Sequence, residues 1–383
     1  MADTRSLEQS IERHKKRKRI QLIIACAVVI VVALSIAIYK KNVSYNQFKV
    51  VKSLDTDDGN GNQYVAFSNF CLKYGLDGIS YVNGKETVWS QAYEMSNPIV
   101  DVCGKYVAVA DKGGNTIYVF DEQSGRGQIN TTYPIVSIEI ANQGVVAALL
   151  EEDNANYIEA YDKEGTLLIS HKTLLNGNGY PLSFSLSEDG TKMVVSYVCI
   201  NSGVVESKIL FFNFGGVGQN EVDRVVGGVN YKSTVIPTVK FLQNNVAIAV
   251  GDNILSIYKM REKPVAQEEI KIKQEIKKLF YNSDYIGLVY ENDSGSKKYK
   301  VVVYDTRGNK VMEKSIDMDF KDIKFTGRNI LVYDDLNCKI IPFKGKEKFS
   351  YTFEQTINTV MPTDKFREYL IITNNKVERI RIK

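Results

Sequence analysis

Short strand-like segments recur along the chain about every 40 residues, and this repeat restricts the fold more than any other feature. The segments are rich in Val, Ile, Tyr and Phe and end in tight turns with Asp, Asn or Gly, a pattern typical of antiparallel strands. The clearest copies are NTIYVFDEQSG (115–125), NYIEAYDKEG (156–165), KILFFNFGG (208–216), YKVVVYDTRG (299–308) and CKIIPFKG (338–345).

A second strand-like segment precedes each of these copies, and a third, often opened by proline, precedes the second. Examples of the second segment are KYVAVAD (105–111), GVVAALL (144–150) and NVAIAV (245–250). No helix is expected after residue 45, because even 266–280 alternates apolar and polar residues with a period of two. Four antiparallel strands per repeat predict an all-β fold, a β-propeller of four-stranded blades.

The number of blades follows from the two ends of the repeat region. Seven complete blades are visible, and the C-terminus adds only three more strands, TINTVMP, EYLIITN and KVERIRIK. The missing fourth strand is expected to be QFKVVKSL (47–54), because pairing the two ends removes the open edge of the ring. The sequence therefore predicts eight blades, with seven as the alternative.

The N-terminal region predicts a single membrane span. Residues 20–39 are apolar apart from Gln21 and Ser35, and twenty helical residues cover about 30 Å, the thickness of a hydrocarbon core. Basic residues crowd the preceding segment, so the positive-inside rule leaves the N-terminus in the cytoplasm. The expected domains are a cytoplasmic tail (1–19), a transmembrane helix (20–39), a linker (40–45) and an extracytoplasmic propeller (46–383).

Other interpretations of the cysteines and of the N-terminal region stay open. Ser35-Ile36-Ala37 is similar to a signal-peptide cleavage site, and the segment that ends at Cys26 is similar to a lipoprotein signal. Both compete with an uncleaved signal anchor at the cell membrane. Beyond the span, four cysteines lie in strand patterns typical of buried free thiols, with a Cys71–Cys103 bridge as the alternative.

The turn motifs VFDEQSG, AYDKEGT and VYDTRGN resemble the repeats of quinoprotein-type and WD40-type propellers. The anchor followed by a propeller resembles single-pass, membrane-anchored β-propeller proteins of unknown function from Gram-positive bacteria, over about residues 20–383. Quinoprotein enzymes carry a tryptophan in most blades, whereas this chain has only Trp89. The resemblance therefore implies the fold, and no cofactor is expected.

Composition and motifs argue against nucleic-acid binding and catalysis. Seven of the 49 basic residues and three of the 45 acidic residues lie in 1–19, so the remaining chain is neutral, unlike a nucleic-acid binder. His171 is the only histidine outside the tail, and the acidic run 55–62 fits no EF-hand register. We therefore expect no enzyme, and no catalytic, metal or cofactor residues.

Two groups of residues are candidates for binding. Alignment of the innermost strands places Asp101 and Glu139 in neighbouring blades, with Lys240 and Lys324 on the other side of the ring. The long connections between blades, 172–181 and 227–236, contain Tyr180, Tyr231 and Lys232, and both tyrosines are expected to be exposed and dispensable for folding.

These candidates lead to three functional hypotheses. The first is a non-catalytic protein-binding or scaffold module of the cell envelope. The alternatives are a receptor for cell-wall glycan or another small polar ligand, and an envelope lyase or hydrolase that uses the two neighbouring carboxylates.

Overall fold

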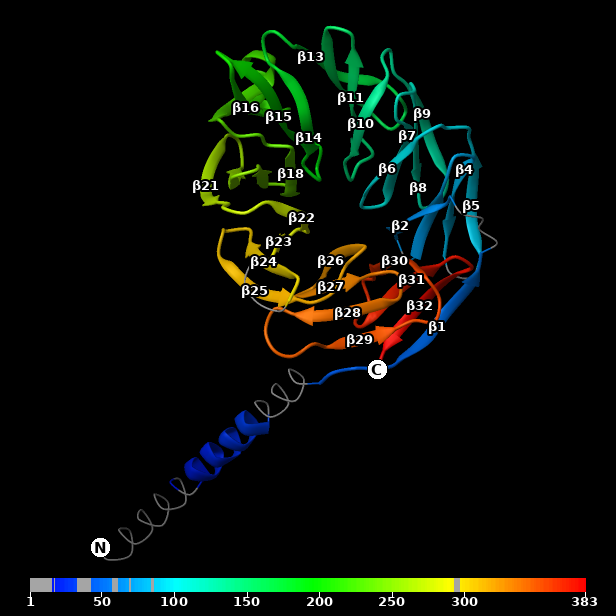
Figure 1. Cartoon of the computed structure of the whole chain (residues 1–383), viewed down its shortest axis with the longest axis vertical. Coiled ribbons are helices and arrows are strands. Elements are labelled where there is room, and N and C mark those ends of the chain that lie inside the picture. The colour runs from blue at the N-terminus through cyan, green and yellow to red at the C-terminus, as the bar shows by residue number, and fades with distance from the viewer. Residues whose placement is uncertain are drawn as a thin grey trace, which may run out of the picture.

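The chain forms a ring of eight blades, as the repeat predicts (Figure 1). The computed structural model describes Lys16 and residues 18–32, 43–56, 61–68, 70–83, 86–292 and 297–383. Each blade is a four-stranded antiparallel sheet whose first strand lies nearest the axis of the ring. The expectation of an all-β, eight-bladed propeller is therefore confirmed.

Blades one to four follow one another along the chain. Their strands are β2 (Gln63–Phe67), β3 (Phe70–Tyr74), β4 (Gly78–Val82) and β5 (Thr87–Ala92) in blade one, β6 (Pro98–Cys103), β7 (Tyr106–Asp111), β8 (Thr116–Asp121) and β9 (Gly125–Asn130) in blade two, β10 (Ile135–Ile140), β11 (Val146–Glu152), β12 (Ala155–Tyr161) and β13 (Leu167–Leu174) in blade three, and β14 (Tyr180–Leu186), β15 (Lys192–Asn201), β16 (Val204–Asn213) and β17 (Val225–Lys232) in blade four.

Blades five to eight complete the ring. Their strands are β18 (Thr238–Gln243), β19 (Val246–Val250), β20 (Ile254–Met260) and β21 (Pro264–Lys271) in blade five, β22 (Ile276–Tyr281), β23 (Tyr285–Glu291), β24 (Tyr299–Asp305) and β25 (Lys310–Ile316) in blade six, β26 (Asp322–Thr326), β27 (Asn329–Tyr333), β28 (Asn337–Pro342) and β29 (Phe349–Thr352) in blade seven, and β30 (Ile357–Pro362), β31 (Glu368–Thr373), β32 (Lys376–Ile382) and β1 (Phe48–Asp55) in blade eight.

The two ends of the chain close the ring in blade eight. Strand β1 pairs antiparallel with β32, from Phe48 opposite Ile382 to Asp55 opposite Lys376. The predicted shared blade is therefore confirmed. Just before β1, the Tyr45 amide donates to the Lys348 carbonyl at 2.6 Å, which also ties the entering chain to blade seven.

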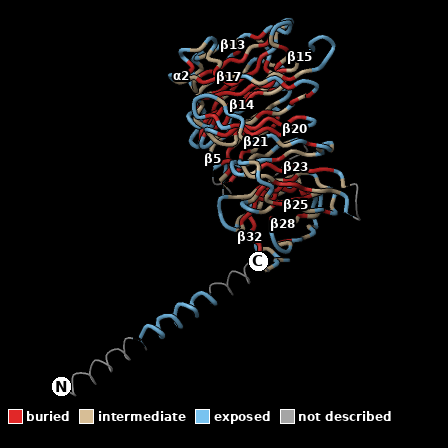
Figure 2. The backbone as a smooth tube through the Cα atoms, turned by 90° about the vertical axis from the view of Figure 1, so that its left-hand side faces the viewer, coloured by how far each residue is buried: buried red, intermediate tan, exposed pale blue. Residues whose placement is uncertain are grey.

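The described residues form a hydrophobic core of eight clusters, one between each pair of neighbouring blades. In β11, Ala148 and Leu150 pack toward blade two, whereas Ala147 and Leu149 pack toward blade four. Both faces of the second strand are thus buried, which explains why it is apolar at nearly every position. Figure 2 shows the buried backbone inside the blades and the exposed turns at their ends.

The repeated aspartate of the turn motif has a structural role. Asp121 and Asp305 are the last residues of third strands and Asp162 directly follows one, and their carboxylates accept backbone N–H groups within the turn. The shortest of these contacts join the Asp121 Oδ1 to the Gln123 amide (2.8 Å), the Asp162 Oδ1 to the Thr166 amide (2.7 Å) and the Asp305 Oδ1 to the Arg307 and Asn309 amides (both 2.9 Å). Such Asx turns end the strand locally and need no ligand.

The connections divide between two faces of the ring. The long-loop face carries the connections from second to third strand and from blade to blade, and the short-turn face carries the others. The sequence indicates long connections between second and third strands at 150–156 and 199–205, but both segments are strands with turns at residues 153–154 and 202–203. On the short-turn face, blade four has an unpredicted insertion with α2 (Gly216–Gln219) and η1 (Val222–Arg224).

The N-terminal region is described in part. Residues 18–32 are helical and exposed (Figure 2). The exposed residues include apolar ones such as Leu22 and Val29. Among the described residues, no helix has both the length and the apolar character needed to cross a membrane. Residues 33–39 of the predicted span, 40–42 of the linker and 57–60 of the acidic run lie outside the described residues.

The cysteines within the described part of the chain are all free thiols, so the alternative Cys71–Cys103 bridge is wrong. Cys71 and Cys338 are buried in the interfaces between blades, and Cys103 and Cys199 are partly buried. Burial raises the pKa of the Cys71 thiol to about 12, which keeps it protonated and unreactive near neutral pH.

Candidate functional site

Asp101, Glu139 and Lys240 form a polar cluster beside the axis of the ring. They come from the innermost strands β6, β10 and β18, in blades two, three and five. The Lys240 ammonium donates to the Glu139 carboxylate, so the expectation that Lys240 lies apart from the acidic residues is wrong. Blade four presents the short Ser185 between them, which leaves room for the long lysine side chain to cross.

Hydrogen bonds in this cluster connect each blade to the next. In each case, a side-chain oxygen on one inner strand accepts a hydrogen bond from a backbone N–H on the inner strand of the next blade. These bonds join the Ile140 amide to the Asp101 Oδ2 (2.7 Å), the Leu186 amide to the Glu139 Oε2 (2.8 Å) and the Phe241 amide to the Ser185 Oγ (3.0 Å). Ser185 also donates to Glu139 at 3.0 Å. These bonds thus connect the inner strands of four successive blades.

The electrostatics of the cluster reflect two carboxyl groups that share one ammonium group. Burial raises the pKa of Asp101 and of Glu139 above the ordinary values of these side chains. Burial alone would lower the pKa of Lys240, but the charges of Glu139 and Asp101 outweigh it and raise this pKa. A carboxyl pair of this kind has the residue types of acid–base chemistry, but both groups here have partners within the protein.

A second ionic group lies across the ring and was missed by the sequence alignment. Asp322 of β26 contacts Lys278 of β22 at 3.0 Å and Lys324 of its own strand at 3.3 Å. Lys324 also donates to the Val360 carbonyl of blade eight at 3.3 Å. This group has one carboxylate for two ammonium groups, the reverse of the first cluster. The sequence alignment compared one position in each inner strand. Asp322 and Lys278 occupy other positions in their strands, so the alignment did not identify them.

Tyr231 is buried, so its predicted place on an exposed loop is wrong. It lies in β17, and its hydroxyl donates to the Ser256 hydroxyl at 2.8 Å and lies 3.3 Å from Glu269 Oε1. It also shares a hydrogen bond with the Tyr258 hydroxyl. The predicted connection 227–236 is strand β17 as far as Lys232. Tyr231 is therefore part of the core between blades four and five.

Tyr180 and Lys232 lie at strand ends on the long-loop face, although neither is in a loop. Tyr180 begins β14, is partly exposed, and its hydroxyl reaches Glu151 Oε1 at 3.5 Å. Lys232 ends β17 and is exposed. The structure therefore leaves these two side chains accessible, and it separates them from Asp101 and Glu139 on the innermost strands.

The most prominent feature of the long-loop face is the hairpin of β15 and β16, with ten residues in each strand. Its tip, residues 200–205, exposes Ile200, Val204 and Val205 by 76%, 42% and 40%. Leu174, the last residue of β13, and Leu175, in the connection from blade three to blade four, are also exposed. We define these five apolar residues as the hairpin patch, in which Ile200 and Val205 lie opposite each other on one face of the hairpin and Val204 lies on its other face. The apolar sequence around the Ser202–Gly203 turn is the signal that could have identified it.

The hairpin patch is held in place by close backbone packing. Gly179, at the end of the connection from blade three, has a φ of +89°, and a Cβ there would lie 2.4 Å from the Val198 carbonyl oxygen. Only glycine tolerates both the left-handed backbone and this approach. The connection between blades is thereby packed against the base of the hairpin.

His171, the only histidine outside the N-terminal tail, lies in β13 of blade three. Its ring packs edge-on against Phe212, with 5.0 Å between the ring centroids. Burial lowers its pKa, so the imidazole is neutral near pH 7. Asp223 and Arg224 of the blade-four insertion line the same small cavity, of about 200 Å³. The ring thus belongs to the packing between blades three and four.

Comparison with solved structures shows the fold. The ring is similar to BamB from Moraxella catarrhalis, with 13% identity and a TM-score of 0.52 over 88% of this chain and all of that one. It is also similar to Sqt1 from Saccharomyces cerevisiae, with 11% identity and a TM-score of 0.58 over 89% of this chain and all of that one. No curated protein matches the sequence. One family model, described as a family of unknown function, matches residues 40–382, and the chain therefore belongs to this family, DUF5711.

Proposed function

We propose that this protein is a membrane-tethered, extracytoplasmic module that binds another protein of the cell envelope and catalyses no reaction. The hairpin patch is the observation that carries the proposal. Exposed apolar residues grouped on an elaborated loop face are typical of surfaces that bind proteins. Tyr180 and Lys232 lie on the same face and supply an aromatic and a charged contact at its margin.

The direction of the strands supports a tether that leaves this face free. Strand β1 is the fourth strand of blade eight, so it starts on the short-turn face, beside the C-terminus (Figure 1). The chain from the N-terminal helix therefore enters the ring on the face opposite the hairpin patch. A helix anchored in a membrane would place the patch on the side facing away from the bilayer.

The axial cluster supports the non-catalytic part of the proposal. Glu139 accepts hydrogen bonds from an ammonium, a hydroxyl and a backbone amide. Asp101 accepts the amide of Ile140. These contacts give both carboxyl groups a role in joining blades, so the proposal does not require them to act on a substrate.

Site-specific cross-linking in native membranes tests the binding surface. A photoreactive amino acid at position 204 should cross-link a partner protein, whereas the same group at Val222 should not. Val222 is a matched control, because its side chain is 84% exposed on the short-turn face of the same blade. The double change Ile200→Asp and Val205→Asp should then abolish capture of that partner. Equal cross-linking from both positions, or capture that survives the double change, would overturn the proposal.

Protease accessibility tests the tether. Seven basic residues precede Ile20, so the ring is expected outside the cytoplasmic membrane. Protease added to cells stripped of their wall should digest residues 43–383 and spare the N-terminal tail. Protection of the ring in sealed cells, with digestion after lysis, would show the opposite orientation.

A further inference from the structure

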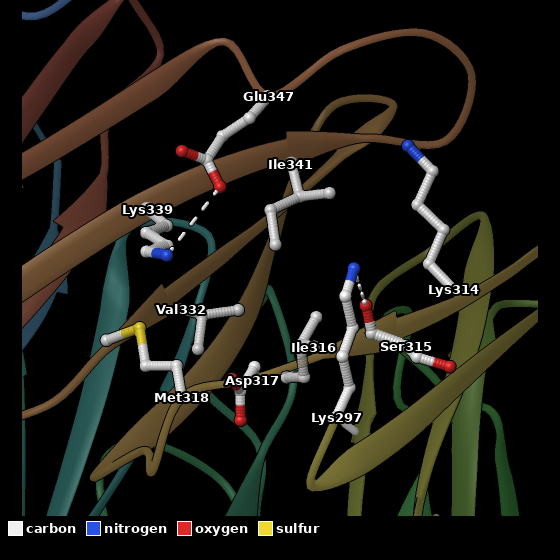
Figure 3. Close-up of a pocket in the computed structure, with 10 residues that line it drawn as sticks. All are labelled: Lys297, Lys314, Ser315, Ile316, Asp317, Met318, Val332, Lys339, Ile341 and Glu347. Carbon is white, nitrogen blue, oxygen red and sulfur yellow. Dashed lines mark hydrogen bonds and ion pairs between the residues drawn. The ribbon is translucent and has the colours of Figure 1, made fainter. Parts of the chain in front are cut away.

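A cavity of about 370 Å³ opens on the side of the ring between blades six and seven (Figure 3). It lies between β25, the outer strand of blade six, and strands β27 and β28 of blade seven. The site is remote from the hairpin patch in blade four and from the axial cluster. Its volume falls in the range of about 300–1,000 Å³ that is usual for small-molecule sites.

The floor of the cavity is apolar. Ile316, Met318, Val332 and Ile341 line it, and Ile316 and Val332 belong to the buried cluster between the two blades. The core between blades six and seven therefore reaches the surface here. An alkyl chain placed on this floor would remove the partly buried Met318 and Ile341 from water, which is favourable.

The rim of the cavity is basic. Among the described residues, Lys297, Lys314 and Lys339 line it together with two acidic residues, Asp317 and Glu347. Lys314 donates to the carbonyls of Pro342 and Gly345, and burial lowers its pKa. This lysine therefore holds the neighbouring turn in place.

The other two lysines have weaker contacts within the described part of the chain. The Lys297 ammonium lies 3.4 Å from the Ser315 carbonyl, and the Lys339 ammonium lies 3.9 Å from Glu347 (Figure 3). An ammonium group has three N–H donors, so both lysines keep donors for a ligand. The lining also has more positive than negative groups, which favours an anion.

We propose that this cavity binds an amphipathic anion, with a carboxylate or phosphate head at Lys297 and Lys339 and an alkyl chain on the apolar floor. This combination matches both parts of the lining, whereas an alcohol lacks the charge and a short anion such as acetate lacks the chain. The inference is independent of the protein-binding surface proposed above.

Two sources would supply such a molecule, a free fatty acid or a membrane lipid. The entering chain lies close by, because the Ser44 hydroxyl donates to the Glu347 carbonyl at 2.7 Å. A helix in a bilayer would therefore attach beside the cavity. The chemistry of recognition is the same for either source, and the experiment separates them.

The test uses the full chain in nanodiscs of zwitterionic phosphatidylcholine. The probes are octanoate with a photoreactive diazirine on its chain, the corresponding alcohol and amine, and a phosphatidylglycerol with a diazirine on its acyl chain. Labelled residues are located by peptide mass spectrometry. Octanoate labelling of the floor residues indicates a free amphiphile, phosphatidylglycerol labelling indicates a lipid, and either supports the proposal.

Variants identify the role of the charges. The double change Lys297→Ala and Lys339→Ala should lower labelling of the floor about tenfold, which corresponds to about 1.4 kcal/mol of lost binding. The matched control is Lys344→Ala with Lys346→Ala, two exposed lysines of the adjacent turn that do not line the cavity. Unchanged near-ultraviolet circular dichroism shows that both variants fold. If the alcohol or amine labels the floor as well as the anions, or if neither anion labels it, the proposal is wrong.

Discussion

Glu139 illustrates how a charged side chain is accommodated beside the axis. Its side chain is 14% exposed, and it accepts from Lys240, from Ser185 and from the Leu186 amide. Removing one partner from such a group leaves the other charge without compensation, and that costs more than replacing both partners together. The cluster therefore makes strong predictions about single and double variants.

The change Lys240→Met should lower the free energy of unfolding by about 1–3 kcal/mol, because Glu139 and Asp101 lose their shared cation. Adding Glu139→Gln should recover part of this loss, since the amide carries no charge. Urea unfolding of the two variants checks the prediction. If Lys240→Met is as stable as the wild type, the ion pair contributes nothing to the free energy of unfolding.

The pH dependence of the same variant has a definite sign. Burial raises the pKa of Asp101 and Glu139, so folding favours their protonated forms, and this contribution to stability is lost as the pH rises through the raised pKa. Without Lys240, both pKa values should rise further. The penalty of Lys240→Met should therefore be smaller at pH 5 than at pH 7.5, and a larger penalty at pH 5 would contradict this account.

Asp121 of the turn motif should show the opposite dependence. Burial alone would raise its pKa, but hydrogen bonds from Arg126 and from the Gln123 and Ser124 amides outweigh burial and lower it. Its contribution to stability is therefore present above the unfolded pKa and is lost as the pH falls through the folded one. Asp121→Ala should cost about 1–3 kcal/mol at pH 7 and less at pH 3, as measured by urea unfolding. A penalty that grows toward pH 3 would exclude this role.

At the scale of the strand, Tyr231 and Tyr180 should differ in their importance for folding. Tyr231 is buried in β17 with hydroxyl partners in blade five, so Tyr231→Ala should cost about 3–5 kcal/mol. Tyr180 is partly exposed, and Tyr180→Ala should cost far less. Thermal unfolding of the two single variants measures the difference. Equal losses would mean that Tyr231 does not pack as described.

The strands were predictable from the sequence because alternating apolar residues record burial directly. In β19 every position is apolar, and in β11 the first five positions are, because both faces of these strands contact a neighbouring blade. The ends of the strands and the lengths of the loops were harder to predict from the sequence. Polar residues such as Ser196 and Ser207 lie inside the long hairpin, where they bond to the backbone of Ile236 in the connection to blade five.

The candidate sites were predictable only in part, because the sequence pattern indicates the strand positions but not how far a long side chain reaches. The alignment of inner strands correctly placed Asp101 and Glu139 beside the axis, since strand register fixes the backbone. It did not find the Lys240 contact, because a long side chain reaches past one blade. The cavity between blades six and seven depends on Lys297, Lys314 and Lys339 from three different segments, and no local pattern brings them together.

At the scale of the whole molecule, the ring depends on the pairing of its two ends. Each blade has a buried cluster on both sides, so a gap at any position exposes two apolar faces. Blade eight is the one blade built from both termini, with β1 as its outer strand. Phe48 of β1 also packs against Tyr351 and Phe353 of blade seven, with ring centroids 5.0 and 5.4 Å apart.

Deletion of residues 1–55 should therefore lower the melting temperature by several degrees compared with deletion of residues 1–41 alone. The longer deletion leaves the β32 N–H and C=O groups without the β1 partner and uncovers the aromatic residues that Phe48 contacts. The shorter deletion removes none of the ring and serves as the control. A synthetic peptide of residues 43–55, added to the longer deletion, should restore the melting temperature by occupying the vacant edge. If the two deletions melt together, or if the peptide has no effect, closure by β1 does not stabilise the ring.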